Sequence, residues 1–207
     1  IREAVGPGVS IRADANRGYT PEEAIQLCRL AEKYGVGLEL LEQPVEAHDI
    51  PGLAMVRNAV DVLIEADESC FTVHDARAIV RAEAADVLNI KIAKAGGLAP
   101  AMEISRIAEE AGLQSVLGTS FGTGVTIAAK LHLAAAVRSF TGAVEFTELG
   151  IHGPLLRGEL DRKLGRRQLL DSRQRGRKEY RVHRDVAQRQ QDIDRRDARR
   201  QRRLLLG

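Results

Sequence analysis

The sequence predicts an α/β fold, a partial TIM-type (β/α) barrel of about six strands followed by a disordered or irregular basic tail. Short apolar runs alternate with longer amphipathic segments, and successive strands are about 25 to 28 residues apart. Regular strand–helix alternation is typical of a parallel sheet with right-handed crossovers. A complete barrel has eight strands and about 250 residues, whereas this chain has 207 residues. A doubly wound open sheet is the structural alternative.

Six strands are predicted, over residues 9–13, 38–41, 62–64, 86–92, 115–117 and 143–146. Five helices are predicted between them, over residues 21–34, 49–59, 73–82, 98–111 and 125–137. The first helix has the clearest start, because Thr20, Pro21 and Glu23 supply an N-cap, a first-turn proline and a capping-box glutamate. Residues 1–5 resemble the end of a further helix, so we expect the fold to include an N-terminal part that is absent from this chain.

Charge divides the chain into two parts. Residues 161–207 contain 15 Arg, 2 Lys and 7 Asp or Glu, a net charge of +10, whereas residues 1–160 carry −8. We therefore predict a folded domain over residues 1–157 and a basic, Arg-rich tail over residues 158–207, whose sparse aliphatic residues cannot bury enough area to order it. An unselected sequence, as from a shifted reading frame, is the favoured explanation of this tail.

A genuine solvated tail and an arm that binds nucleic acid are the alternatives for residues 158–207. Clustered arginines neutralise phosphates, but Tyr180 is the one aromatic residue after position 160 that could stack on a base. Nucleic acid is therefore not an expected partner.

Composition excludes several classes of protein. A hydrophobic fraction of 44% excludes wholesale disorder. No apolar run reaches the roughly 18 residues of a membrane-spanning helix, and two cysteines, Cys28 and Cys70, cannot frame a disulfide-rich fold. No secretory signal opens the chain, so we expect a cytoplasmic protein without a membrane partner.

Acidic residues stand at the predicted C-terminal ends of three consecutive strands. The strands are expected to end at about residues 14, 42, 67 and 91, where Asp14, Glu42, Asp67 and Lys91 stand. Barrel active sites lie at this edge, and neighbouring strands are only about 4.8 Å apart. Three carboxylates there repel one another unless a cation lies between them, and carboxylates alone favour Mg²⁺ or Mn²⁺. Each acid could instead cap a helix or face solvent, but the ordered set of four makes this interpretation less favoured.

Lys91 is expected to lie beside that cation. A nearby positive charge and burial both lower the pKa of an amine, which suits Lys91 to act as a base near neutral pH.

The motifs around these residues resemble the enolase superfamily, and within it the mandelate racemase/muconate lactonizing enzyme family, in its muconate cycloisomerase-like subgroup. The separations of 28, 25 and 24 residues between the four residues agree with that subgroup. The matching motifs are Asp14-Ala15-Asn16, Glu42-Gln43-Pro44, Ala66-Asp67-Glu68-Ser69 and Lys91-Ile92-Ala93-Lys94-Ala95-Gly96-Gly97. The resemblance covers about residues 1–157, the C-terminal barrel portion only. The capping domain, and the earlier strand with its Lys-x-Lys, are absent.

The resemblance implies an isomerase that removes and returns the α proton of a small carboxylate substrate through a metal-stabilised enolate. Asp14, Glu42 and Asp67 would hold Mg²⁺ or Mn²⁺, and Lys91 would be the catalytic acid/base. The supporting or substrate-binding residues would be Asn16, Gln43, Glu68, Lys94, Ser120 and Glu148. The full-length form would be a homo-oligomer.

The reaction implied is that of a cycloisomerase, racemase or epimerase. Residues 147–156 resemble the Thr-Glu-Leu-Phe-Gly-Pro-Leu-Leu stretch of muconate cycloisomerases, and the Asp-x-Asp that dipeptide epimerases carry at this place is absent. A cycloisomerase-like or other carboxylate substrate is therefore expected rather than a dipeptide. The alternatives are a sugar-acid dehydratase on the same scaffold, disfavoured because residues 118–122 contain no His, and an inactive barrel fragment whose basic tail binds nucleic acid.

Overall fold

The computed structural model of the chain describes residues 1–120, 122–137 and 140–145. The chain divides into two units, residues 1–153 and residues 154–207. The second unit lies outside the described residues, and so do the predicted tail and Glu148.

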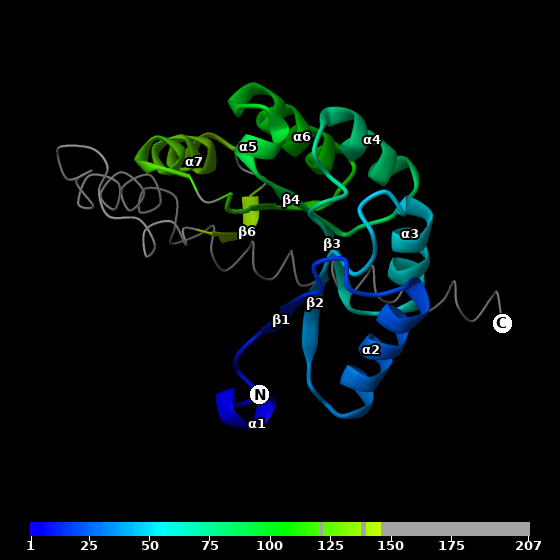
Figure 1. Cartoon of the computed structure of the whole chain (residues 1–207). Helices are drawn as coiled ribbons and strands as arrows, with labels where there is room; N and C mark the ends of the chain where they lie inside the picture. The colour runs from blue at the N-terminus through cyan, green and yellow to red at the C-terminus, as the bar shows by residue number, and fades with distance from the viewer. Residues whose placement is uncertain (121, 138–139, 146–207) are drawn as a thin grey trace. The chain divides into compact units, whose positions relative to one another are not determined.

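One sheet of six parallel strands forms the centre of the first unit, and its spatial order is β1-β2-β3-β4-β5-β6 (Figure 1). The strands are β1 (Ile11–Asp14), β2 (Leu38–Glu42), β3 (Leu63–Ala66), β4 (Val87–Ile90), β5 (Gln114–Leu117) and β6 (Phe140–Val144). Each strand pairs with its neighbours in sequence, which is the order of a barrel, whereas a doubly wound sheet reverses its order at a switch point. The partial barrel is confirmed and the open-sheet alternative is wrong.

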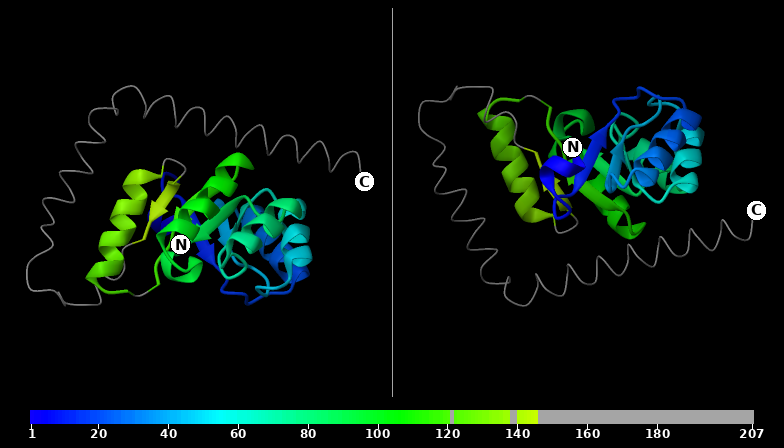
Figure 2. Two further views of the ribbon diagram at one scale, coloured as in Figure 1. Left: turned by 90° about the horizontal axis from the view of Figure 1, so that it is seen from above. Right: turned by 90° about the horizontal axis from the view of Figure 1, so that it is seen from below.

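Helices α2, α3, α4 and α6 follow one another along one side of the sheet (Figures 1 and 2). The helices are α1 (Arg2–Val5), α2 (Pro21–Lys33), α3 (Ile50–Ala59), α4 (Val73–Arg81), α5 (Ile92–Ala95), α6 (Leu98–Glu110) and α7 (Gly124–Ala136). The five predicted helices are present with bounds that differ by one residue at most, and α1 matches the helix end expected at residues 1–5. None of the helices in the described part of the chain combines the length and the apolar character that crossing a bilayer requires.

Side-chain caps fix where the helices begin. The predicted capping box of α2 is present, because the Glu23 amide donates to Thr20 Oγ1 at 3.3 Å and the Thr20 amide donates to Glu23 Oε2 at 2.8 Å. Thr72 and Asp75 form the same reciprocal pair at α4, with an aspartate in the role of the glutamate. Asp49 caps α3 by accepting from the Gly52 amide at 2.8 Å. Such caps satisfy amides that have no partner within the helix.

The strand bounds differ from the predicted ranges by one to three residues, and two of these differences have a clear physical cause. The fourth strand ends at Ile90 rather than at residue 92, because the chain turns at once into the single helical turn α5, which Gly96 ends in a left-handed conformation with φ 86°. The sixth strand covers residues 140–144 rather than 143–146. Phe140 pairs with Ser115 and Val144 with Leu117 across an irregular register, and the polar Thr141-Gly142 interrupts the apolar run that would have marked this strand.

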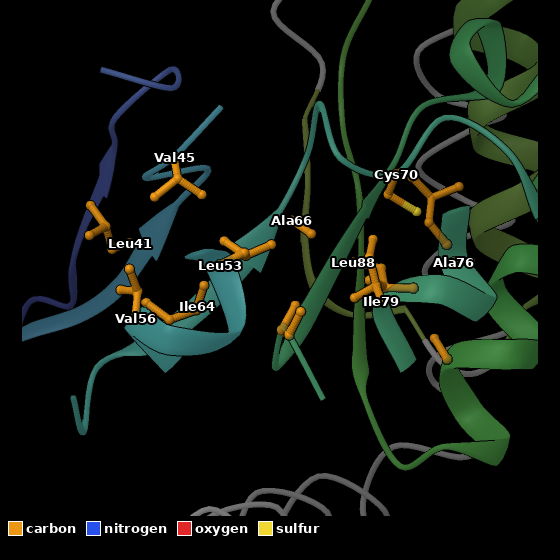
Figure 3. Packing of buried hydrophobic residues seen from close by; sticks show 14 of the residues in the cluster. Leu41, Val45, Leu53, Val56, Ile64, Ala66, Cys70, Ala76, Ile79 and Leu88 are labelled. Carbon is orange, nitrogen blue, oxygen red and sulfur yellow. The ribbon is translucent and has the colours of Figure 1, made fainter. Parts of the chain in front are cut away.

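The strands present alternate residues to two apolar clusters. Leu41, Ile64 and Leu88 belong to the main core, together with Leu53 of α3 and Ile79 of α4 (Figure 3). The residues adjacent to these in each strand point to the opposite face, where a second, small cluster consists of Leu40, Leu63, Val87 and Val116. Helices cover the first face. The predicted site residues at the strand ends lie on the second face.

A buried carboxylate joins three elements at the opposite end of the sheet. Asp86 has no exposed surface. Its Oδ2 accepts from the Ile64 amide at 2.9 Å and its Oδ1 accepts from Arg57 Nε at 3.0 Å. Arg57 also donates to the Glu83 carbonyl at 2.8 Å. The carboxylate therefore fixes the start of β4 against β3 and α3.

The change Asp86→Ala should lower the free energy of unfolding by about 2–4 kcal/mol, because it leaves a buried amide and a largely buried guanidinium without their acceptor. Urea unfolding measures this loss. The control is Glu110→Ala, which removes the exposed ion pair with Arg106 and should cost under about 1 kcal/mol. Equal losses in the two variants would contradict this role for Asp86.

Candidate functional site

The predicted site residues lie at the C-terminal edge of the sheet. Asp14 and Glu42 are the last residues of β1 and β2. Asp67 and Lys91 directly follow β3 and β4. Because parallel strands all run in the same direction, these four side chains come from four adjacent strand ends, as the sequence predicts.

The register places the acidic residues side by side. Asp14 is the pairing partner of Glu42, and Glu42 is the partner of Glu65. Asp67 follows Glu65 by two residues, so both point to the same face of the sheet. Asn89 of β4 reaches across β3 to donate from Nδ2 to Glu42 Oε1 at 2.8 Å. Side chains from three neighbouring strands therefore meet on this face.

Two lysines bind the Asp67 carboxylate. Lys91 donates a hydrogen bond to one oxygen and Lys94 to the other. Lys94 also donates to the Asp67 carbonyl at 2.6 Å, and its ammonium lies 5.2 Å from the centre of the Phe71 ring. Lys91 is the N-cap of α5 and Lys94 lies in its single turn, so one short element delivers both positive charges to Asp67.

The acidic residues disturb one another's protonation. Burial, followed by the negative charges of Glu65, Asp14, Asp67 and Glu145, raises the pKa of Glu42 to about 8. Burial also raises the pKa of Glu65 to about 7, although the charge of Arg12 opposes this shift. For Asp67, burial acts in the same direction, but the two lysines outweigh it and hold its pKa below the ordinary value. If all of these carboxyl groups were ionised, their negative charge would therefore exceed the positive charge of the two lysines.

The lowered pKa predicted for Lys91 rests on burial and a neighbouring cation together, and it stays a prediction, because the protein groups alone shift this pKa the other way. Burial does act to lower it, but the hydrogen bond to Asp67 and the charges of Asp67, Glu42 and Glu145 raise the pKa above its usual value. A carboxylate beside an amine stabilises the protonated form. Lys91 is therefore held as an ammonium while it is paired with Asp67.

The expected supporting residues connect the strand-end loops. Gln43 is fully buried, and its Oε1 accepts from the amides of Asp67 at 2.9 Å and Ser69 at 3.1 Å. Its Nε2 donates to the Val45 carbonyl at 2.9 Å and to Ser69 Oγ at 2.8 Å. Asn16 donates from its amide and from Nδ2 to the two oxygens of Asp14, at 2.9 Å and 2.8 Å. These bonds fix the backbone on both sides of the acidic residues.

The other predicted supporting residues are Glu68, Ser120, Lys94 and Glu148, of which Glu68 and Ser120 make fewer hydrogen bonds among the described residues. Glu68 makes an ion pair with Arg17 at 3.7 Å, and its Oε2 is buried without a hydrogen-bond partner in the described part of the chain. The Oγ of Ser120 is buried and lacks such a partner within the same residues. Lys94 joins the site through Asp67, as described above, whereas Glu148 lies outside the described residues.

Three functional-site residues were not predicted from the sequence. Glu65 is buried inside β3, and Glu145 directly follows β6, where its Oε2 accepts from the Thr119 amide at 3.0 Å. Lys130 of α7 is 1% exposed and donates to Thr119 Oγ1 at 2.8 Å and to the Glu145 carbonyl at 3.2 Å. An acidic residue within an otherwise apolar strand is the signal that could have found Glu65.

The carboxylate side chains at the strand ends have the chemistry of ligands for a divalent cation. Within residues 1–120, 122–137 and 140–145, no three or more His, Cys, Asp or Glu side chains form a group that could hold an ion, and lysines engage both oxygens of Asp67. The donors themselves are carboxylate oxygens, which Mg²⁺ and Mn²⁺ prefer. The buried Oε1 of Glu65 has no hydrogen-bond partner among the described residues, and the pKa of Glu42 is raised. A divalent cation would favour the ionised form of these carboxyl groups, which burial and mutual repulsion otherwise keep protonated.

Gly118 leaves room for two side chains of the site. A Cβ built on Gly118 would lie 2.0 Å from Asn89 Oδ1 and 2.8 Å from Lys91 Cε. Any side chain at position 118 would therefore displace both Asn89 and Lys91.

The change Gly118→Ala should lower the free energy of unfolding by about 1–3 kcal/mol, the usual cost of overpacking. Gly8→Ala is the matched control, because no atom lies within 4 Å of its added Cβ. Chemical denaturation compares the two variants. A Gly118→Ala protein as stable as the control would contradict this close packing.

The raised pKa of Glu42 predicts a stability that depends on pH. In the presence of a chelator, the folded chain keeps this proton up to about pH 8, whereas the unfolded chain releases it near pH 4.3. The folded state therefore binds more protons between these values, and the free energy of unfolding falls as the pH rises through this window.

Glu42→Gln should reduce that slope and make the variant more stable than the wild type at pH 8. Urea titrations at pH 5, 6.5 and 8 measure the difference, with exposed Glu110→Gln as the control. An unchanged slope in Glu42→Gln would show that Glu42 ionises normally.

Known proteins resemble this chain in sequence and in fold. The L-Ala-D/L-Glu epimerase of Bacillus subtilis is 43% identical over 141 residues, which are 68% of this chain and 38% of that protein. The Enterococcus faecalis dipeptide epimerase, solved with Mg and the dipeptide L-Leu-L-Tyr, is 41% identical with a TM-score of 0.66, over 69% of this chain and 40% of that one. A muconate cycloisomerase from Azorhizobium caulinodans is 35% identical with a TM-score of 0.64, over 70% and 40% of the two chains.

The chain spans about two fifths of the length of the curated relatives that it matches. Dipeptide epimerases among these relatives go against the substrate expectation drawn from the missing Asp-x-Asp. The family model described as "Enolase C-terminal domain-like" matches residues 1–172. The chain therefore belongs to the enolase superfamily, as a C-terminal domain of its mandelate racemase/muconate lactonizing enzyme family.

Proposed function

We propose that the chain carries the site of an isomerase that removes and returns the α proton of a carboxylate substrate, in the manner of an epimerase or racemase. The observation that carries this proposal is the joint placement of Asp14, Glu42, Asp67 and Lys91 at four adjacent strand ends. A lysine base beside carboxylates that can hold a divalent cation is the arrangement that α-proton chemistry on a carboxylate uses in this superfamily.

Asp14, Glu42 and Asp67 would hold Mg²⁺ or Mn²⁺. A relative has been solved with Mg and a dipeptide, and the carboxylate oxygens of this edge suit such an ion. When bound, the cation supplies positive charge that offsets the negative charge developing on the substrate carboxylate. Gln43 and Asn16 would keep the ligands in place through the hydrogen bonds that they make to the backbone and to Asp14.

Lys91 would be the residue that carries the proton. An amine accepts a proton only when it is neutral, and the pairing with Asp67 favours the ammonium form. Lys91 must therefore give up this pairing before it can act as a base, and its pKa would fall toward a useful range once it does. The same ammonium can then return a proton to the face of the α carbon from which it came, which accounts for α-proton exchange, whereas inversion would need a second acid on the opposite face.

A dipeptide is the substrate class that the relatives favour. Three of them are named for the epimerisation of dipeptides, in Bacillus subtilis, Clostridium acetobutylicum and Enterococcus faecalis. We further propose that residues 1–157 are the barrel domain and residues 158–207 a separate basic tail, on the evidence of their opposite net charges.

The change Lys91→Ala should reduce α-proton exchange with deuterated solvent by at least about 10²–10⁴-fold, because it removes the general base. Exchange is followed by NMR on an L,L-dipeptide with Mg²⁺ present, and a chelator should abolish it in the unchanged chain. Lys33→Ala, which removes an exposed lysine of α2, is the control and should exchange normally. Exchange that persists in Lys91→Ala would remove Lys91 from the mechanism.

A further inference from the structure

The loop that follows β1 places Arg17 next to the loops that follow Glu42 and Asp67. Asn16 and Arg17 both have positive φ angles, 45° and 64°, a left-handed conformation that non-glycine residues adopt at some cost. The Arg17 amide donates to the Gln43 carbonyl at 2.8 Å and the Tyr19 amide donates to the Pro44 carbonyl at 3.0 Å. The position of Arg17 is therefore fixed against the loop that follows Glu42.

The Arg17 side chain reaches from the end of β1 to the loop that follows β3. Its Nε lies 3.7 Å from Glu68 Oε1, and 46% of its side chain is exposed. No hydrogen bond from the guanidinium to another described residue accompanies this loose ion pair. An arginine carries five donors in a planar fork, so most of the donors of Arg17 have no partner among the described residues.

The three lysines near this edge are already engaged, and Arg12, whose charge also acts on Glu65, pairs with Glu39 at 3.4 Å. Lys91 and Lys94 bind the two oxygens of Asp67. Lys130 is buried against Thr119. A substrate with a second anionic group would meet repulsion from the surrounding carboxylates unless a cation at the rim offset that charge.

We propose that Arg17 is a specificity-determining residue that selects substrates with a second anionic group, such as a dipeptide whose reacting residue has an acidic side chain. This inference rests on the proposed function. The guanidinium would exchange its loose contact with Glu68 for a forked, charge-assisted pair with the substrate carboxylate. Glu68 would then orient the guanidinium from behind without binding the substrate.

The test compares L-Ala-L-Glu with L-Ala-L-Gln, which has nearly the same shape but no charge, in the α-proton exchange assay with Mg²⁺. The full 207-residue chain should have a kcat/KM for the Glu dipeptide about 10–100-fold above that for the Gln dipeptide. Arg17→Gln should remove this preference, mainly through KM, and leave the rate with the Gln dipeptide within about threefold. Arg17→Lys should restore part of it.

Arg29→Gln is the matched control, because Arg29 is an exposed arginine of α2, and it should keep the preference. The inference is overturned if the unchanged chain shows no preference. It is also overturned if Arg17→Gln slows both dipeptides equally, as a general structural effect would.

A binding measurement separates this inference from the proposed function. Isothermal titration calorimetry with Mg²⁺ compares glutarate, which has two carboxylates, with butyrate, which has one. Tighter binding of glutarate that Arg17→Gln removes would support the inference even if no dipeptide exchanges its α proton, a result that would count against the proposed function alone. Equal binding of glutarate by the unchanged chain and by Arg17→Gln would overturn it.

Discussion

The crowding of negative charge at one edge of a parallel sheet is the constraint on which the rest of the site depends. Parallel pairing makes Asp14, Glu42 and Glu65 neighbours, and Asp67 projects from the next position on the same face. Like charges in a partly buried place oppose one another's ionisation. Lys91 and Lys94 both bind the carboxylate of Asp67. Glu42 and Glu65 have no such partner among the described residues, and their pKa values are raised. The chemistry that we propose would draw on this imbalance.

Most of the fold could be predicted because its signals are local and repeated. Capping residues and helical periodicity place α2 and α4 to within one residue. One element was missed and one was misplaced, both for physical reasons. A single turn such as α5 is too short for any periodicity to appear, and β6 contains Thr141-Gly142, so its pairing with β5 rather than its own composition defines it. Tertiary pairing overrides local propensity in such strands.

The site was predictable only where a residue stands at the end of a recognisable strand. Asp14, Glu42, Asp67 and Lys91 meet that condition. Glu145 does not, because the misplaced sixth strand hid its position, and Lys130 appears as one polar residue among alanines and leucines of α7. The pKa of Lys91 could not be foreseen either, since it depends on how closely Asp67 approaches, which only the folded chain determines.

The hydrogen bonds of Gln43 determine how the site responds when its carboxylates change their protonation or their ligands. Its side-chain amide is buried, carries no charge and binds backbone groups of Val45, Asp67 and Ser69. Uncharged bonds of this kind are indifferent to pH and to ionic strength. Protonation or ligand exchange at the surrounding carboxylates should therefore reorient side chains around a stationary main-chain frame, so that turnover would require no rearrangement of the barrel itself.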